Sequence, residues 1–83
     1  MNELKDTVEM MLSADYKERF LAEFRQLKIR YEKLRAMLDK WDNNELDFEP
    51  TCPRAIYDLQ IDAMEKYLDI LADRAEMEKI ELY

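Results

Sequence analysis

The chain has 83 residues, a net charge of −7, one cysteine, and neither glycine nor histidine. Missing glycine excludes phosphate-cradling loops and the dinucleotide fingerprint, and missing histidine excludes imidazole bases and mixed Cys–His zinc sites. The acidity argues against direct nucleic-acid binding, while the absence of a long apolar run, a signal peptide or a second cysteine predicts an intracellular protein with no membrane span.

Residues 1–13 predict a short helix with Asn2 as its cap and four apolar residues on one face, Leu4, Val8, Met11 and Leu12. A helix of this length is only marginally stable in water. We therefore expect it to lie on a larger surface, either within the chain or on another copy.

Residues 14–42 predict a long helix, capped by Ser13 or Asp15 with Glu18 in its first turn. Its apolar residues alternate at spacings of four and three, which is a heptad pattern that must face another helix. They are Phe20, Phe24, Leu27, Tyr31, Leu34, Leu38 and Trp41.

Residues 43–53 form a connector, in which Asn43 and Asn44 suit a left-handed helix end. Thr51 or Cys52 is expected to cap the next helix, with Pro53 in its first turn.

Residues 54–81 predict a second long helix with two apolar stripes. The first is Tyr57, Ile61, Met64, Leu68, Leu71 and Ala75, and the second is Ile56, Leu59, Ala63, Ile70 and Met77.

These elements predict an all-α fold, an antiparallel helical hairpin with a short N-terminal helix, in one domain over residues 1–83. Residues 17–40 carry eight cations against four acids and residues 42–83 carry four against twelve, so the two long helices complement each other in charge. An antiparallel register pairs Phe24 with Leu71, and it also places Glu23 near Arg74. The second stripe then needs cover from the first helix and from a second subunit, which predicts a homo-oligomer.

The most site-like group is expected at the hairpin tip, where Trp41, Arg54, Tyr57 and Lys40 gather. Aromatic rings for stacking together with cations for phosphate suit a nucleotide. Weaker candidates for the same nucleotide site are Arg30, Tyr31 and Arg35. The structural alternative is that Trp41 closes the core and Arg54 lies over it in a cation–π contact.

A second candidate is the acidic face of the last helix. It consists of Asp58, Asp62, Glu65, Asp69 and Asp73. Carboxylates at this spacing can imitate a phosphate backbone or, with a matching cluster on a facing helix, hold Mg²⁺. Because the middle helix has no such cluster, we expect no metal site and no cofactor, and the simplest interpretation is a solvated face.

Ten residues of the two long helices resemble a family of small proteins related to one from a crAss-like phage, although the connector with its two prolines is longer than expected for that family. They are Tyr16, Arg19, Glu23, Leu27, Leu34, Gln60, Met64, Tyr67, Leu71 and Arg74. The resemblance implies a phage or prophage accessory protein in a bacterial host cytoplasm, without a catalytic residue.

Together these patterns predict a non-enzymatic binder that counters host defence by sequestering a nucleotide immune signal at subunit interfaces. Two alternatives remain open. One is an inhibitor of a host defence protein, like some anti-CRISPR proteins, whose acidic face blocks a nucleic-acid channel. The other is a structural assembly factor without a ligand.

Overall fold

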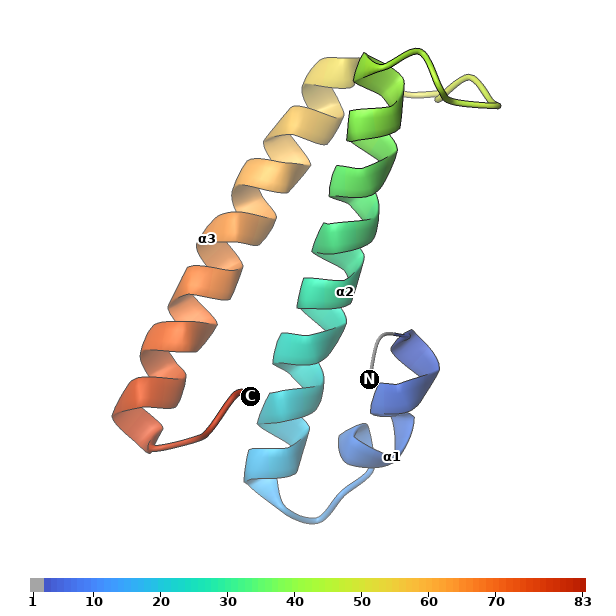
Figure 1. The fold of residues 1–83 in the computed structure, drawn as a ribbon. Helices are drawn as coiled ribbons and strands as arrows, with labels where there is room; N and C mark the ends of the chain where they lie inside the picture. The colour runs from blue at the N-terminus through green and yellow to red at the C-terminus, as the bar shows by residue number, and fades with distance from the viewer. Residues whose placement is uncertain (1–2) are drawn as a thin grey trace.

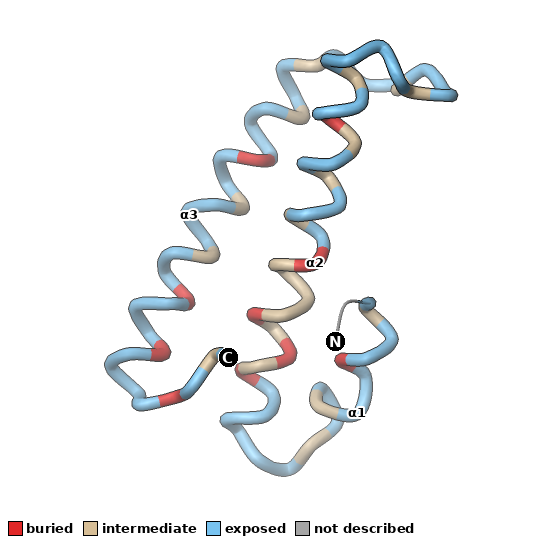
Figure 2. Tube along the Cα trace, in the orientation of Figure 1, coloured by how far each residue is buried: buried red, intermediate tan, exposed pale blue. Residues whose placement is uncertain are grey.

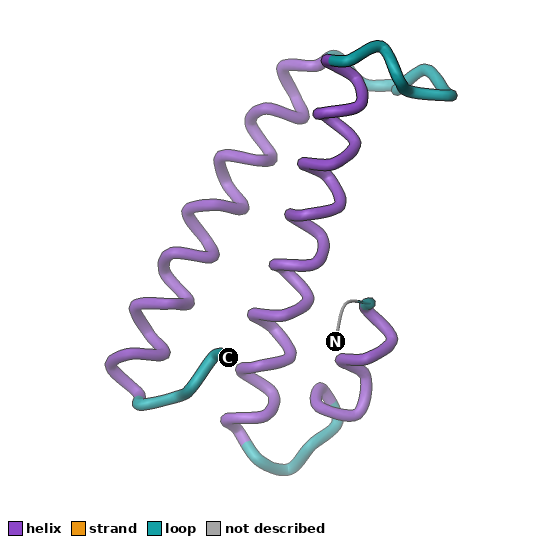
Figure 3. The backbone as a smooth tube through the Cα atoms, in the orientation of Figure 1, coloured by secondary structure: helices purple, strands orange, loops and turns teal. Residues whose placement is uncertain are grey.

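The computed structural model describes residues 3–83, which form a helical hairpin with a short helical segment at one end (Figure 1). The 3₁₀ helix η1 (Leu4–Thr7) leads directly into α1 (Val8–Met11), and two long helices follow, α2 (Tyr16–Asp42) and α3 (Arg54–Glu78). Over the described residues all the regular structure is helical (Figure 3). The predicted all-α hairpin is therefore confirmed.

Local capping explains where α2 begins. The Asp15 carboxylate accepts a hydrogen bond from the Lys17 amide at 2.9 Å, and the Ser13 hydroxyl accepts one from the Asp15 amide at 3.0 Å. Each bond satisfies an amide that the first turn would leave open. At the chain start Glu3 is the residue that precedes η1, and the predicted cap Asn2 lies outside the described residues.

The connector uses the turn chemistry expected of it at one end and differs at the other. Asn44 adopts a left-handed conformation with φ 57°, as the asparagine pair indicated. At the start of α3, however, Thr51 and Cys52 do not cap the helix, because Pro53 is itself the N-cap residue and its carbonyl accepts the Ile56 amide at 3.1 Å. A proline can do this in its ordinary extended conformation, since the cap position needs no amide of its own.

Helix α3 ends at Glu78, short of the predicted boundary at residue 81, because Lys79 turns left-handed with φ 58°. The Ile80 amide then bonds back to the Ala75 carbonyl at 2.8 Å. This closing turn brings Ile80 into the core, where it is 8% exposed, and directs the last residues back toward α2 (Figure 1). Burial of Ile80 thus accompanies an early helix end that no glycine marks in the sequence.

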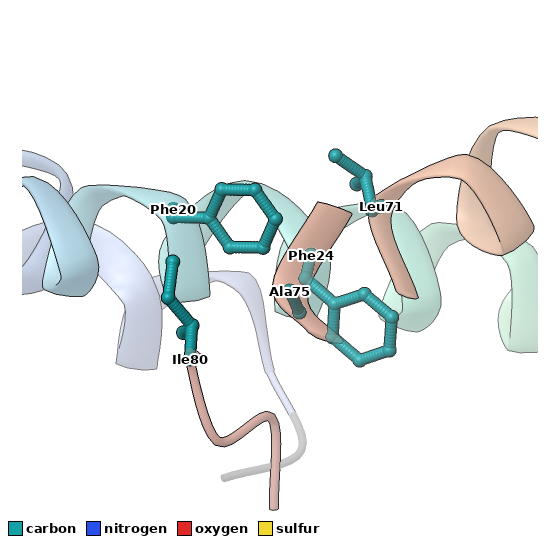
Figure 4. Close-up of a cluster of buried hydrophobic side chains, with 5 residues drawn as sticks. All are labelled: Phe20, Phe24, Leu71, Ala75 and Ile80. Atoms are coloured by element: carbon teal, nitrogen blue, oxygen red, sulfur yellow. The ribbon is translucent and has the colours of Figure 1, made fainter. Parts of the chain in front are cut away.

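The main core joins the first half of α2 to the second half of α3. Its buried members are Phe20, Phe24, Leu71, Ala75 and Ile80 (Figure 4). Phe24 and Leu71 share this cluster, as the predicted antiparallel register requires. Nearer the tip, Leu38 and Ile61 are also buried.

The short segment does not cover α3. Within residues 3–83, η1 and α1 pack on α2, on its side away from α3 (Figure 1). Their packing accompanies the burial of Thr7, Ala22 and Ile29. The expectation that the first helix shields part of the second α3 stripe is therefore wrong, and α3 is exposed along most of its length (Figure 2).

Candidate functional site

The hairpin tip brings together three of the four residues predicted there. The Trp41 and Tyr57 rings meet edge to face with centroids 5.9 Å apart, and the Arg54 guanidinium carbon lies 5.4 Å from the Trp41 ring centroid. The expected cation–π contact is present. Lys40 instead lines a separate hollow on α2 with Lys33 and Phe48.

Carboxylates already engage the cation at this tip. Arg54 donates to both oxygens of Asp42, at 2.6 and 3.3 Å, and its Nε bonds Asp58 at 3.0 Å. The hydrogen bond from Arg54 lowers the pKa of Asp42, and both acids raise that of the guanidinium. A phosphate would have to compete with these two partners. The geometry thus accounts for Arg54 structurally, and a ligand role for the tip stays a prediction.

The acidic face of α3 divides into engaged and open carboxylates. Asp58 is held by Arg54, and Glu65 accepts a hydrogen bond from the Tyr31 hydroxyl at 3.2 Å. Within residues 3–83, no hydrogen bond or ion pair holds Asp62, Asp69 or Asp73. The described part of the chain also contains no group of three or more metal-binding side chains close enough to hold an ion.

A groove of about 480 Å³ lies farther down the hairpin on a face of α2, with Met11 of α1 and Tyr67 of α3 also in its lining. Its lining combines two arginines, one acid, one amide, one aromatic ring and two apolar side chains. These are Arg19, Arg30, Glu23, Gln26, Tyr67, Met11 and Leu27. The groove therefore offers apolar contact, a ring face and paired cations in one place.

Hydrogen bonds position the polar groups of this groove. The Tyr67 hydroxyl donates to Glu23, and this bond raises the pKa of the Tyr67 phenol, so the hydroxyl stays protonated at neutral pH. On the α1 side, Gln26 donates to Thr7 Oγ1 at 2.9 Å and Arg19 donates to the Ser13 carbonyl at 2.8 Å. The short N-terminal segment thus forms one wall of the groove and holds two of its side chains.

Arg30 differs from the other polar residues of the groove. It is exposed, and within residues 3–83 no hydrogen bond or ion pair occupies its guanidinium. A cation whose partner is solvent can bind an anion without first breaking a protein contact.

A second polar network closes the open end of the hairpin. Tyr16 donates to Glu78 at 2.7 Å, and Arg74 donates to the Tyr16 hydroxyl at 2.9 Å while lying 5.0 Å from the Phe20 ring centroid. The predicted neighbours Glu23 and Arg74 do not pair, because Tyr67 reaches Glu23 and Tyr16 reaches Arg74 instead. This network joins the ends of α2 and α3 and has a structural role.

Reasoning from periodicity missed the groove, because three elements far apart in the sequence build it. One signal was available. Arg19, Glu23, Leu27 and Tyr67 all belong to the residues that carried the family resemblance, and all four line the groove.

These features define a small all-helical hairpin protein whose polar and aromatic residues gather in an open surface groove. Its described helices include none that is long and apolar enough to cross a membrane.

The family model described as Sequestin matches residues 14–77, so the chain belongs to the Sequestin family. The match spans α2, the connector and nearly all of α3. The curated proteins and the solved structures contain no significant match to the chain. The link to a crAss-like phage stays a prediction.

Proposed function

We propose that this protein is a non-enzymatic binder that sequesters a small nucleotide in the groove between α1, α2 and α3. The family name fits a sequestering role. On this proposal the protein is a phage or prophage accessory product that acts in the bacterial host cytoplasm and removes a nucleotide immune signal. The phage origin rests on the sequence resemblance.

The observation that carries the proposal is the position of Arg30 and Tyr67 on opposite helices of one groove. An unoccupied guanidinium suits a phosphate, and a tyrosine ring that a hydrogen bond holds in place suits a stacked base. Glu23 and Gln26 supply an acceptor and an amide for ribose hydroxyls or base edges. Apolar contact from Leu27 and Met11 completes a lining typical of small-molecule sites.

The chemistry of these side chains supports a proposal of binding rather than catalysis. The sequence has no histidine, and its one cysteine, Cys52, is exposed on the connector, which does not line the groove. Arginine, glutamine and a protonated tyrosine bind and orient a ligand but do not activate a nucleophile by themselves. The one carboxylate of the groove, Glu23, already accepts the Tyr67 hydroxyl. We therefore assign no catalytic residue.

Calorimetry on the purified chain tests the proposal against a panel of cyclic dinucleotides, cyclic mononucleotides and ADP-ribose derivatives. We expect saturable heat with at least one of them. Since a hydrogen bond to a charged group contributes about 1.5–3 kcal/mol, Arg30→Gln should weaken binding by about ten-fold or more. No heat with any of these nucleotides would remove the proposal.

Matched variants decide where the nucleotide binds. Lys17→Gln removes one exposed α2 cation outside the groove and should leave affinity unchanged, whereas Lys40→Gln removes the cation predicted for the tip. Loss of affinity in Lys40→Gln with none in Arg30→Gln would instead assign the ligand to the hollow on α2 that Lys40 lines. Tyr67→Leu keeps an apolar side chain but removes the ring, so it measures stacking.

The open carboxylates of α3 favour a second candidate function. Asp62, Asp69 and Asp73 repeat along one helix, as in a protein that occupies the nucleic-acid channel of a host nuclease. This candidate predicts salt-sensitive association with such a nuclease, which charge reversal at the three positions abolishes. A structural assembly factor would show self-association and neither of these activities.

A further inference from the structure

Helix α3 presents a second apolar stripe that the described part of the chain leaves uncovered. Ile56, Leu59, Ile70 and Met77 are 50%, 65%, 56% and 80% exposed. Ile56, Ala63, Ile70 and Met77 follow one another at intervals of seven, which keeps them on one line of the helix. Because η1 and α1 pack on α2, no other described helix covers this stripe, which leaves it available to another molecule.

The charges beside the stripe describe what that molecule must carry. Asp62 and Asp69 lie next to Ala63 and Ile70, seven residues apart, which is about 10 Å along the helix. Within residues 3–83 neither carboxylate has a hydrogen bond or ion pair. A complementary surface therefore needs apolar contact bordered by two cations at the same separation.

Helix α2 of the same chain carries such a surface. Lys33 and Lys40 are exposed, are also seven residues apart, and within the described chain form no ion pair. Together with Met37 they line a hollow of about 330 Å³, and Phe48, 53% exposed, adds apolar contact from the connector.

The remaining charges also match. Two cations lie along the stripe. Arg74 is already bonded to Tyr16 and Glu78, whereas Lys66 has no ion pair within residues 3–83. The rim of the hollow on α2 carries the acids Glu45 and Asp47. The two aspartates beside the stripe of one copy can thus face the two lysines of the second copy. Lys66 of the stripe can face the two acids on the rim of the hollow. Packing of one α3 against another would instead place acidic borders side by side, which is unfavourable.

We propose that the α3 stripe of one copy docks on the Lys33–Lys40 surface of a second copy. The two contacting surfaces differ, so the contact is heterologous, and every copy keeps one of each available. Such contacts close into rings or continue as filaments. We therefore expect an assembly of more than two copies, and this proposal does not depend on the nucleotide.

Charge reversal with compensation tests this contact in the full-length chain without ligand. The variants are Lys33→Glu/Lys40→Glu, Asp62→Lys/Asp69→Lys, and the combination of all four changes. Sedimentation velocity and native mass spectrometry report the assembly, and circular dichroism reports the fold. All four side chains are exposed, so helicity should be unchanged.

We expect each double variant to lose more than ten-fold in association constant, because like charges would face each other. The four-fold variant, and an equimolar mixture of the two double variants, should assemble again. As a matched control, Lys17→Glu/Lys79→Glu reverses two exposed lysines outside both surfaces and should assemble normally.

Three results would overturn the proposal: a monomeric wild type, native mass in Lys33→Glu/Lys40→Glu, or a folded four-fold variant that stays monomeric. If Lys33→Glu/Lys40→Glu keeps the native mass while Asp62→Lys/Asp69→Lys no longer assembles, α3 of one copy packs on α3 of another. None of these readings involves nucleotide binding, so this proposal and the proposed function can fail separately.

Discussion

Replacing Leu71 by alanine tests whether the hairpin core lies where the structure places it. Leu71 is fully buried beside Phe24 and Ala75. Removing a buried leucine side chain beyond Cβ costs about 2–5 kcal/mol, through lost transfer energy and the cavity that remains. A chain of this size has a free energy of unfolding of about 4–12 kcal/mol. We expect Leu71→Ala to lose at least about a sixth of this free energy of unfolding.

Urea denaturation followed by circular dichroism at low protein concentration measures this loss, with Leu59→Ala as the matched variant. Leu59 lies on the same helix but is 65% exposed, so its truncation should change the free energy of unfolding by no more than about 0.5 kcal/mol in the monomer. At high concentration, association should raise the wild-type midpoint, and Leu59→Ala should reduce that rise. If Leu71→Ala and Leu59→Ala lost the same free energy of unfolding at low protein concentration, the orientation of α3 in the hairpin would be refuted.

Three further predictions concern local features. Lys79→Gly should raise the free energy of unfolding by about 1 kcal/mol in urea titrations, because glycine adopts φ 58° without strain. Thr7→Val should lower it by about 1–2 kcal/mol, since the change removes the 2.7 Å bond to the Leu4 carbonyl and leaves the Gln26 amide with only the weak acceptor Met11 Sδ. The hydrogen bond from Arg54, which lowers the pKa of Asp42, stabilises the fold at neutral pH. This contribution is lost as the pH falls through the folded-state pKa of Asp42. The melting temperature of wild type should therefore fall more steeply than that of Asp42→Asn between about pH 5 and 2; parallel curves would contradict the pairing with Arg54.

Heptad spacing was sufficient to predict the two long helices and their register. Folding the hairpin symmetrically about the connector sets the apolar seam of α2 against the first stripe of α3, and Phe24 with Leu71 follows from it. The placement of α1 was not predictable from periodicity, since four apolar residues can lie on either long helix. In the structure η1 and α1 pack on α2, where Thr7 accepts a hydrogen bond from Gln26, a contact that no spacing rule specifies.

The site was less predictable than the fold for a related reason. Sequence proximity to the turn suggested Trp41, Arg54 and Tyr57, and those side chains do meet. What the sequence could not specify was that Asp42 and Asp58 would take up the guanidinium. Whether a cation is open to a ligand depends on its neighbours in space.

Tyr67 lies where the two proposed surfaces adjoin. It lines the groove, and it also follows Ala63 by four residues and precedes Ile70 by three, so it borders the apolar stripe. Its ring is in contact with solvent, at 43% exposure for the residue. A second copy that docks on the stripe would thus change the surroundings of the same ring on which we propose that a base stacks.

Linkage makes this adjacency measurable. If assembly alters nucleotide affinity by some factor, nucleotide must alter the association constant by the same factor. We expect sedimentation at sub-saturating protein to show tighter association with the bound nucleotide, and Tyr67→Leu to lose that shift while keeping the ligand-free assembly. An association constant that does not change with nucleotide would show that groove and stripe act independently, because thermodynamic coupling cannot run in one direction only.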